Sequence, residues 1–222
     1  MEKVVVIARA FQEIDWIEKL DCNVVIMNKG LPIDTRFKSK CLEEVMLENK
    51  WRGEGSYLEY IIRNYGNYPD VLAFTQDNPF PHCKDIIEKI NSYSDDTLKP
   101  LGIVMKSDNQ IYLKEILPLV FKSSPVYESE LSFCAGNQYI LPSKMLMKKS
   151  LDWWINAFEV FKDASNYLYD YFQENPDPIK VLPNHDAERL KSLGFETHKE
   201  WIDYNMPHIY ERIMWKMYEY EE

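Results

Sequence analysis

The stretch VLAFTQDNPF, residues 71–80, decides how the rest of this sequence is interpreted. Its first half is a continuous apolar run, which is typical of a strand buried on both faces of a sheet. Its second half places Gln76, Asp77 and Asn78 where that strand ends, and Pro79 then redirects the chain. Because ligands of open α/β sheets bind beyond the carboxyl ends of the strands, this stretch predicts a binding site at the sheet edge.

Strand and helix patterns alternate along the chain on both sides of this stretch. We expect strands over Lys3–Ala8, Asn23–Met27, Val71–Thr75, Leu101–Met105 and Gln138–Leu141. We expect helices over Glu13–Leu20, Leu42–Asn49, Ser56–Tyr65, Lys84–Tyr93 and Ile111–Phe121, a mainly helical segment over Lys144–Tyr171, and a last helix from Met206-Pro207 to about Tyr220. The pattern predicts an α/β fold of Rossmann type, with a mostly parallel central sheet flanked by helices and a helical, aromatic-rich C-terminal part. We expect a single domain over residues 1–222, with its two halves divided near residue 105.

The composition excludes several classes of protein. No apolar stretch approaches the ~20 residues that a membrane-spanning helix needs. The formal net charge of −10 disfavours a nucleic-acid partner, since it would repel a phosphate backbone. The four cysteines form no CxxC pair, which favours reduced thiols and a cytoplasmic protein. The composition does not predict an oligomeric state.

Two other predicted strands end in residues suited to the same edge of the sheet. Ala8-Arg9 closes the first strand and Asn28-Lys29-Gly30 closes the second. If the strands are parallel, their charges meet Asp77, which could hold Mg²⁺ or Mn²⁺ between diphosphate oxygens. Alternatively, Asp77 or Asn78 caps the following helix, and the two basic residues are ordinary surface charges.

The closing helix offers a second set of candidates. His208, Glu211 and Trp215 follow one another at three- and four-residue spacing, so they share one helix face. If this face closes over the cleft, Glu211 is a candidate general base and His208 a second metal or phosphate contact. Alternatively, Glu211 stabilises the start of the helix or pairs with an arginine. His82 is likewise either a cleft residue or a structural hydrogen-bonding group, and we expect aromatics such as Trp153 and Trp154 to be mostly core.

Six stretches occur in the same order as motifs of a known family. They are VVIARAFQEIDWI, MNKG, GEGSYLEYIIRNYGNYPDV, AFTQDNPFPH, CAGNQYILPS and MPHIYERIMW. The sequence thereby resembles, over nearly its whole length, uncharacterised proteins related to the GT-A type of glycosyltransferase, whose segments read VVARYNEDLSWL, YNKG, GREAHTYL, PDVTVFLQGDPFDH, GAQFAVS and PWVLERLW. In the fourth segment the carboxylate of the family lies one position later than Asp77. The GREAHTYL segment is matched loosely, by Arg52, Glu54 and Tyr57-Leu58.

The resemblance implies a GT-A fold and a metal-dependent enzyme that transfers a hexosyl or pentosyl group. Residues 1–105 would form its nucleotide-binding half and residues 106–222 its acceptor-side half. The donor is a nucleoside-diphosphate sugar, with UDP favoured over GDP, and the acceptor is a glycan or another hydroxyl compound. Asp77 and His208 would hold Mn²⁺ or Mg²⁺, and Glu211 and Asp77 would be the catalytic pair. The residues implied for donor binding are Ala8, Arg9, Asn28, Lys29, Gly30, Arg52, Gln76, Asn78 and Gly136. Members of this family occur in fungi, bacteria and large DNA viruses, so a viral member would act in the host cytoplasm.

Two rival functions remain open at this point. The first is a non-catalytic protein of the same fold that binds a nucleotide or a glycan, and the displaced position of Asp77 is its best support. The second is another Rossmann-like transferase, such as a methyltransferase. We rank it last because the first strand lacks the glycine-rich turn that dinucleotide and many adenosyl cofactors require.

Overall fold

The computed structural model describes residues 1–50, 52–108, 116–122, 130–167, 192, 194 and 198–221. The strands are β1 (Lys3–Arg9), β2 (Asn23–Asn28), β3 (Cys41–Met46), β4 (Val71–Gln76), β5 (Lys99–Pro100), β6 (Val104–Ser107), β7 (Leu131–Cys134) and β8 (Tyr139–Pro142). The α-helices are α1 (Arg52–Arg63), α2 (Ile86–Ser92), α3 (Leu117–Phe121), α4 (Leu151–Tyr167) and α8 (His198–Glu219). Short 3₁₀ helices are η1 (Asp15–Lys19), η2 (Thr35–Ser39) and η4 (Ser143–Lys148). No helix among these residues is long and apolar enough to span a membrane.

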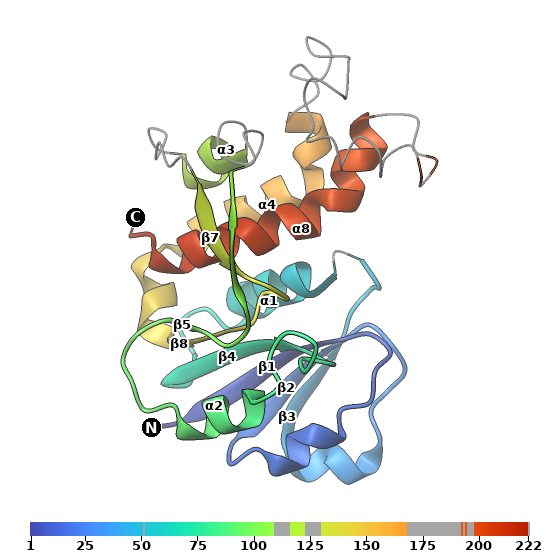
Figure 1. The fold of residues 1–222 in the computed structure, drawn as a ribbon, viewed down its shortest axis with the longest axis vertical. Helices are drawn as coiled ribbons and strands as arrows, with labels where there is room; N and C mark the ends of the chain where they lie inside the picture. Colours follow the sequence, from blue (N-terminus) through green and yellow to red (C-terminus); the bar gives the residue numbers. More distant parts are fainter. Residues whose placement is uncertain are drawn as a thin grey trace.

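A six-stranded sheet in the order β3-β2-β1-β4-β8-β5 forms the centre of the molecule. Strands β1 to β4 are parallel, and β8 and β5 complete the sheet in antiparallel pairings. This confirms the predicted α/β class with a mostly parallel sheet. Ala8 pairs with Gln76 and Arg9 with Asn28, so three parallel strands end at one edge. Strands β6 and β7 form a separate antiparallel pair that rises from this sheet (Figure 1).

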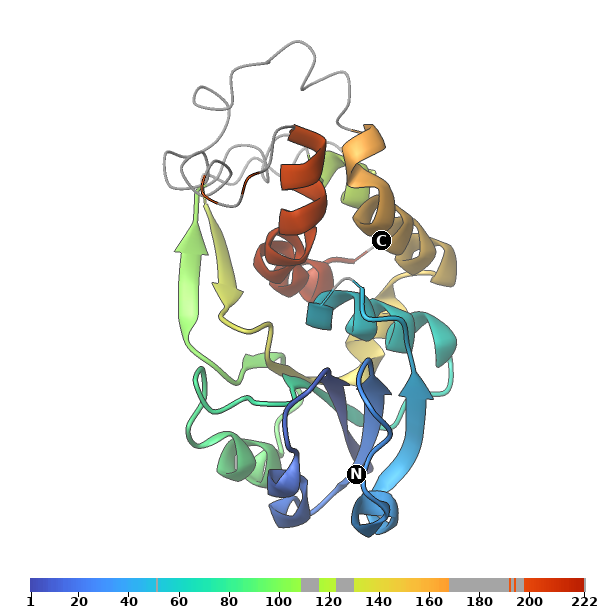
Figure 2. The same cartoon turned by 90° about the vertical axis from the view of Figure 1, so that its right-hand side faces the viewer.

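Helices cover both faces of the sheet because its strands are apolar on both sides. In β1, Val4 and Val6 belong to the core beneath α1, α4 and α8, whereas Val5 and Ile7 belong to the core on the opposite face. This assignment follows the two-residue period of a strand. The second face is covered by α2, η1 and η2 (Figures 1 and 2).

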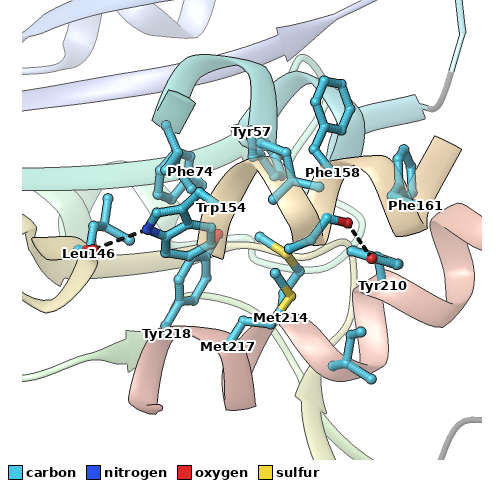
Figure 3. Close-up of a cluster of buried hydrophobic side chains, with 14 of the residues drawn as sticks. Tyr57, Phe74, Leu146, Trp154, Phe158, Phe161, Tyr210, Met214, Met217 and Tyr218 are labelled. Atoms are coloured by element: carbon cyan, nitrogen blue, oxygen red, sulfur yellow. Dashed lines mark hydrogen bonds between the residues drawn. The ribbon is translucent and has the colours of Figure 1, made fainter. Parts of the chain in front are cut away.

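Aromatic side chains fill the space between the sheet and the C-terminal helices (Figure 3). Phe74 of β4 stacks on Tyr218 of α8, with ring centroids 5.8 Å apart and an interplanar angle of 5°. Trp154 of α4 is fully buried and donates its indole N–H to the Leu146 carbonyl at 3.1 Å. Trp153 is 4% exposed, which confirms that both tryptophans belong to the core.

Three predicted elements differ from the observed ones. The helix expected over Glu13–Leu20 is only the 3₁₀ helix η1, although its apolar residues are buried as expected. The segment 42–49 contains most of strand β3 rather than a helix, because hydrogen bonding to β2 outweighs the helix propensity of its Leu, Glu and Met residues. The last helix begins at His198, not near Pro207, so this proline lies inside α8 and removes one helical hydrogen bond.

Two further predictions are met only in part. The strand expected over Leu101–Met105 is displaced toward β6, which begins at Val104. Of the helix expected over Ile111–Phe121, α3 accounts for Leu117–Phe121, and residues 111–115 lie outside the described part of the chain.

Candidate functional site

A pocket of about 410 Å³ lies beyond the carboxyl end of β4. This volume is within the range of small-molecule sites, and the position is the one at which α/β sheets bind ligands. Its walls come from elements that are far apart in the sequence: the start of α1, the end of β4, β6, β7, the turn after β7 and the α8 helix. The lining residues are Arg52, Glu54, Gln76, His82, Met105, Phe133, Ala135, Gly136, Pro207, His208, Glu211 and Arg212.

The pocket brings together five of the residues expected from the sequence, namely Arg52, Gln76, Gly136, His208 and Glu211. The other expected residues do not line it, and they are Ala8, Arg9, Asn28, Lys29, Gly30, Asp77 and Asn78. Most of this second group instead forms hydrogen bonds among the strand ends and the loops that follow them.

Asp77 binds backbone amides instead of facing the pocket. Its Oδ2 accepts hydrogen bonds from three consecutive amides, those of Ala10, Phe11 and Gln12, at 2.9, 3.3 and 3.1 Å. Its Oδ1 accepts the amide of Asn78 at 2.9 Å. The carboxylate therefore joins the loop after β4 to the loop after β1. This placement differs from the metal-holding role expected from the sequence. It also differs from the alternative in which Asp77 caps the helix that follows it, because three of the amides that it binds belong to the loop after β1.

The described residues do not assemble a metal site. Among them, no group of three or more His, Cys, Asp or Glu side chains is placed to hold a metal ion. Both oxygens of Asp77 are engaged by amides, and Nε2 of His208 lies 2.7 Å from the Arg52 guanidinium. The expected pair of ligands, Asp77 and His208, thus does not fit a shared metal in this arrangement.

Arg9, Asn28 and Gly30 bind the ends of β1 and β2 to each other. The Arg9 guanidinium donates to Oδ1 of Asn28 at 3.0 Å and to the Leu31 carbonyl at 2.6 Å. Oδ1 of Asn28 also accepts the Gly30 amide. A Cβ atom on Gly30 would lie 1.8 Å from the Ala10 carbonyl oxygen, so only glycine fits this close approach.

Lys29 connects the end of β2 to the start of α1. Its ammonium group donates hydrogen bonds to the backbone carbonyls of Lys50 and Arg52. Burial lowers the pKa of Lys29 to about 8, and the nearby Glu54 carboxyl opposes this shift. The side chain therefore positions the N-terminal residues of α1, which enter the pocket.

Glu211 is the most extensively hydrogen-bonded carboxylate of the pocket. Its Oε1 accepts the Gly136 amide at 2.6 Å, and its Oε2 lies 3.2 Å from Nη1 of Arg212 and 3.7 Å from Nδ1 of His208. Burial raises the pKa of Glu211, but the interactions with His208, Gly136 and Arg212 outweigh it and bring the pKa below its usual value. Glu211 is therefore ionised at neutral pH.

Glu54 is a second carboxyl in the same pocket, and the sequence interpretation did not select it as a site residue. It lies in the first turn of α1 and is 5% exposed. Burial raises its pKa to about 8, and the negative charge of Glu211 adds to this effect. A sequence signal for this residue exists: Glu54 precedes Leu58 and Ile61 by four and seven residues, which places it on the apolar face of the helix.

Gly136 allows the turn after β7 to approach the loop after β4. It has a φ of 74°, and a Cβ atom there would lie 2.7 Å from Cδ2 of His82. His82 thus enters the pocket wall beside this turn.

Arg212, Met105 and Phe133 also line the pocket but were not expected from the sequence. A single charge on a helix and two apolar residues on strands form no distinctive pattern.

Comparison with protein-family models, with curated proteins and with solved structures finds no match to this chain. The chemical character of the pocket must therefore be inferred from its side chains. Arg52 and Arg212 provide donors suited to phosphate or carboxylate oxygens. Glu211 provides an ionised carboxylate, and Met105 and Phe133 provide an apolar wall. The pocket can accordingly hold an anionic ligand with an apolar or ring-shaped part.

Proposed function

We propose that this protein is a glycosyltransferase of GT-A type that transfers a sugar from a nucleoside-diphosphate sugar to a hydroxyl acceptor. One observation carries the proposal: nine of the twelve lining residues come from four of the six stretches that resemble the glycosyltransferase-related family. The lining residues of these four stretches lie up to 158 residues apart in the sequence, from Glu54 to Arg212. Their convergence on one pocket at the carboxyl edge of a parallel sheet supports a common ligand.

The side chains fit the charge changes of such a transfer. As the acceptor oxygen bonds to the anomeric carbon, the bond from that carbon to the diphosphate breaks, and the nucleoside diphosphate leaves with the electron pair. Arg52 and Arg212 are placed to stabilise this negative charge, which is the kind of preorganised interaction that contributes most to catalysis. Glu211 is the proposed base that takes the proton of the acceptor hydroxyl.

A divalent metal is part of what the resemblance implies, and Mn²⁺ or Mg²⁺ belongs to the proposal as an optional component. When bound, it would stabilise the departing diphosphate as a Lewis acid. Since Asp77 and His208 do not form a metal site as they are placed, we assign the charge stabilisation by protein groups to the two arginines. We retain the preference for UDP over GDP and the cytoplasmic location as expectations from the sequence.

A non-catalytic protein that binds a nucleotide or a glycan is the second candidate. It is favoured by the engagement of Asp77, because the carboxylate at the end of β4 is held by backbone amides. Such a protein would use the same pocket and the same arginines. A nucleotide-binding member of this kind would differ from the enzyme in turnover and not in its nucleotide ligand.

Thermal shift with UDP, GDP and their sugars, each with and without Mn²⁺, tests the ligand. A ligand at ~100 times its Kd adds about 2.7 kcal/mol to the free energy of unfolding. We expect Arg52→Gln to lose this gain, and Arg63→Gln, at the exposed end of the same helix, to keep it. The proposal is contradicted if no nucleoside diphosphate stabilises the protein.

Turnover separates the enzyme from the binding protein. We expect the wild-type protein to hydrolyse the sugar donor slowly or to transfer its sugar. We expect Glu211→Gln to bind the donor but to react roughly 10²- to 10⁴-fold more slowly, the usual loss when a general base is removed. Donor binding without any release of sugar by the wild-type protein would instead favour the non-catalytic candidate.

A further inference from the structure

Glu54 is a carboxyl buried in the pocket wall without a strong hydrogen-bonding partner. It is 5% exposed, and the hydrogen bond that its carboxyl accepts comes from its own backbone amide. Glu211 differs, since its oxygens receive an amide and a guanidinium. An ionised carboxylate is costly to bury without donors, whereas a protonated carboxyl is buried at much lower cost.

Charged and titratable groups approach Glu54 from three elements. Lys29 follows β2, Arg52 and Tyr57 belong to α1, and Glu211 and Tyr218 belong to α8. The two cations favour an ionised Glu54, but burial and the charge of Glu211 disfavour it and prevail. Two carboxyls in one pocket with opposite environments adopt different protonation states, one ionised and one neutral.

We propose that Glu54 remains protonated at neutral pH and donates its O–H to an anionic oxygen of the bound ligand, beside the guanidinium of Arg52. The proposal rests on the diphosphate ligand proposed above, and it names a further group that holds it. An ionised Glu54 would repel a diphosphate. A neutral one both removes this repulsion and adds a hydrogen-bond donor.

The raised pKa of Glu54, about 8, sets the range over which this contact is lost. Below pH 7 the carboxyl is protonated and the donor is present. Above pH 8 Glu54 is mostly ionised in the free protein and must take up a proton when the ligand binds. The affinity therefore falls by about tenfold for each further pH unit. Glutamine at this position keeps an N–H donor at every pH.

The first test measures the Kd of UDP from pH 7 to pH 9. We expect wild-type affinity to fall about tenfold more over this range than that of Glu54→Gln, because the comparison cancels the titration of UDP and of Lys29. Glu59→Gln, a partly exposed glutamate of the same helix, should follow the wild-type profile. Parallel profiles of wild type and Glu54→Gln would overturn the proposal while leaving the glycosyltransferase proposal intact.

A second test needs no ligand. In the free wild-type protein labelled with ¹³C at glutamate side chains, one carboxyl resonance should titrate near pH 8, and it should be missing from Glu54→Gln. If every glutamate titrates below pH 6, the proposal is wrong whether or not UDP binds. If the resonance titrates near pH 8 but UDP and pyrophosphate fail to bind, the ligand assignment fails instead and Glu54 donates to no diphosphate.

Discussion

The guanidinium of Arg52, at the start of α1, lies 2.7 Å from Nε2 of His208 on α8. Because an arginine remains protonated and can only donate, Nε2 must be the acceptor, and the ring proton must reside on Nδ1. That nitrogen points toward Oε2 of Glu211, 3.7 Å away. Three charged or polar groups from two helices are thereby aligned along the pocket wall.

This alignment predicts the tautomer of His208. We expect ¹⁵N chemical shifts to show a protonated Nδ1 and an unprotonated Nε2 at pH 8. In Arg52→Met the donor is missing, so the proton should redistribute toward Nε2, while the shifts of His82 should not change. A wild-type His208 that carries its proton on Nε2 would contradict the hydrogen bond from Arg52.

Asp77→Asn should reduce stability through the loop after β1. The substitution removes a charge that accepts three amides and places an amide group near them. Hydrogen bonds to a charged group contribute about 1.5–3 kcal/mol, so we expect a loss of about 2 kcal/mol in urea unfolding. The exposed Asn78→Ala should change stability by less than about 0.5 kcal/mol. Unchanged stability together with a lost response to Mn²⁺ would show that Asp77 serves a metal after all.

Alanine should lower the stability of the protein at Gly30 but not at Gly53. In Gly30→Ala the new Cβ would overlap the Ala10 carbonyl at 1.8 Å, so we expect a loss of about 3 kcal/mol as the strand ends separate. In Gly53→Ala the nearest atoms are 3.5 Å away, and alanine favours a helix, so stability should stay constant or rise by up to about 1 kcal/mol. Chemical denaturation of both variants checks the pair, and equal effects would contradict it.

The buried Lys149 should make the stability of the protein depend on pH. It is 1% exposed, and its ammonium donates to the carbonyls of Met145 and Tyr218, both at 3.2 Å. Burial lowers its pKa to about 7 from an ordinary value of 10.5, with Lys148 adding to the shift. The unfolded chain therefore binds more protons than the folded one between these values. The contribution of Lys149 to the free energy of unfolding should rise from pH 7 to pH 10.

The measurement compares urea unfolding of wild type, Lys149→Met and Lys148→Met across this range. The rise should be smaller in Lys149→Met than in wild type, because the titrating group is gone. Lys148→Met should follow the wild type, since Lys148 is more exposed and pairs with Glu221. Identical pH slopes in wild type and Lys149→Met would contradict the lowered pKa.

The sequence predicts the centre of the fold well because its signals there are local. Strands β1, β2 and β4 are continuous apolar runs, and each occurs within one or two residues of its predicted range. Strand β3 was not predicted, since its alternation is weak and only the pairing with β2 decides its conformation. Pro207 suggested a helix start, whereas the helix begins nine residues earlier.

The candidate site was predicted in part for a similar reason. His208 and Glu211 share a helix face by spacing alone, and both line the pocket. The role of Asp77 depends on amides more than 60 residues away, and no local pattern indicates them. The spacing of Glu54 to Leu58 and Ile61 places it on the apolar face of α1, but its part in the pocket depends on α8, more than 140 residues later in the sequence.

Helix α8 contributes Tyr218 to the aromatic core and Glu211 to the pocket. During synthesis the ribosome releases this helix more than 100 residues after the sheet strands β1, β2 and β4. A nascent chain that lacks it has neither the wall opposite Arg52 nor the ring that stacks on Phe74. The binding capacity of this protein should consequently arise in the same step that completes its folding, with no earlier form able to capture the ligand.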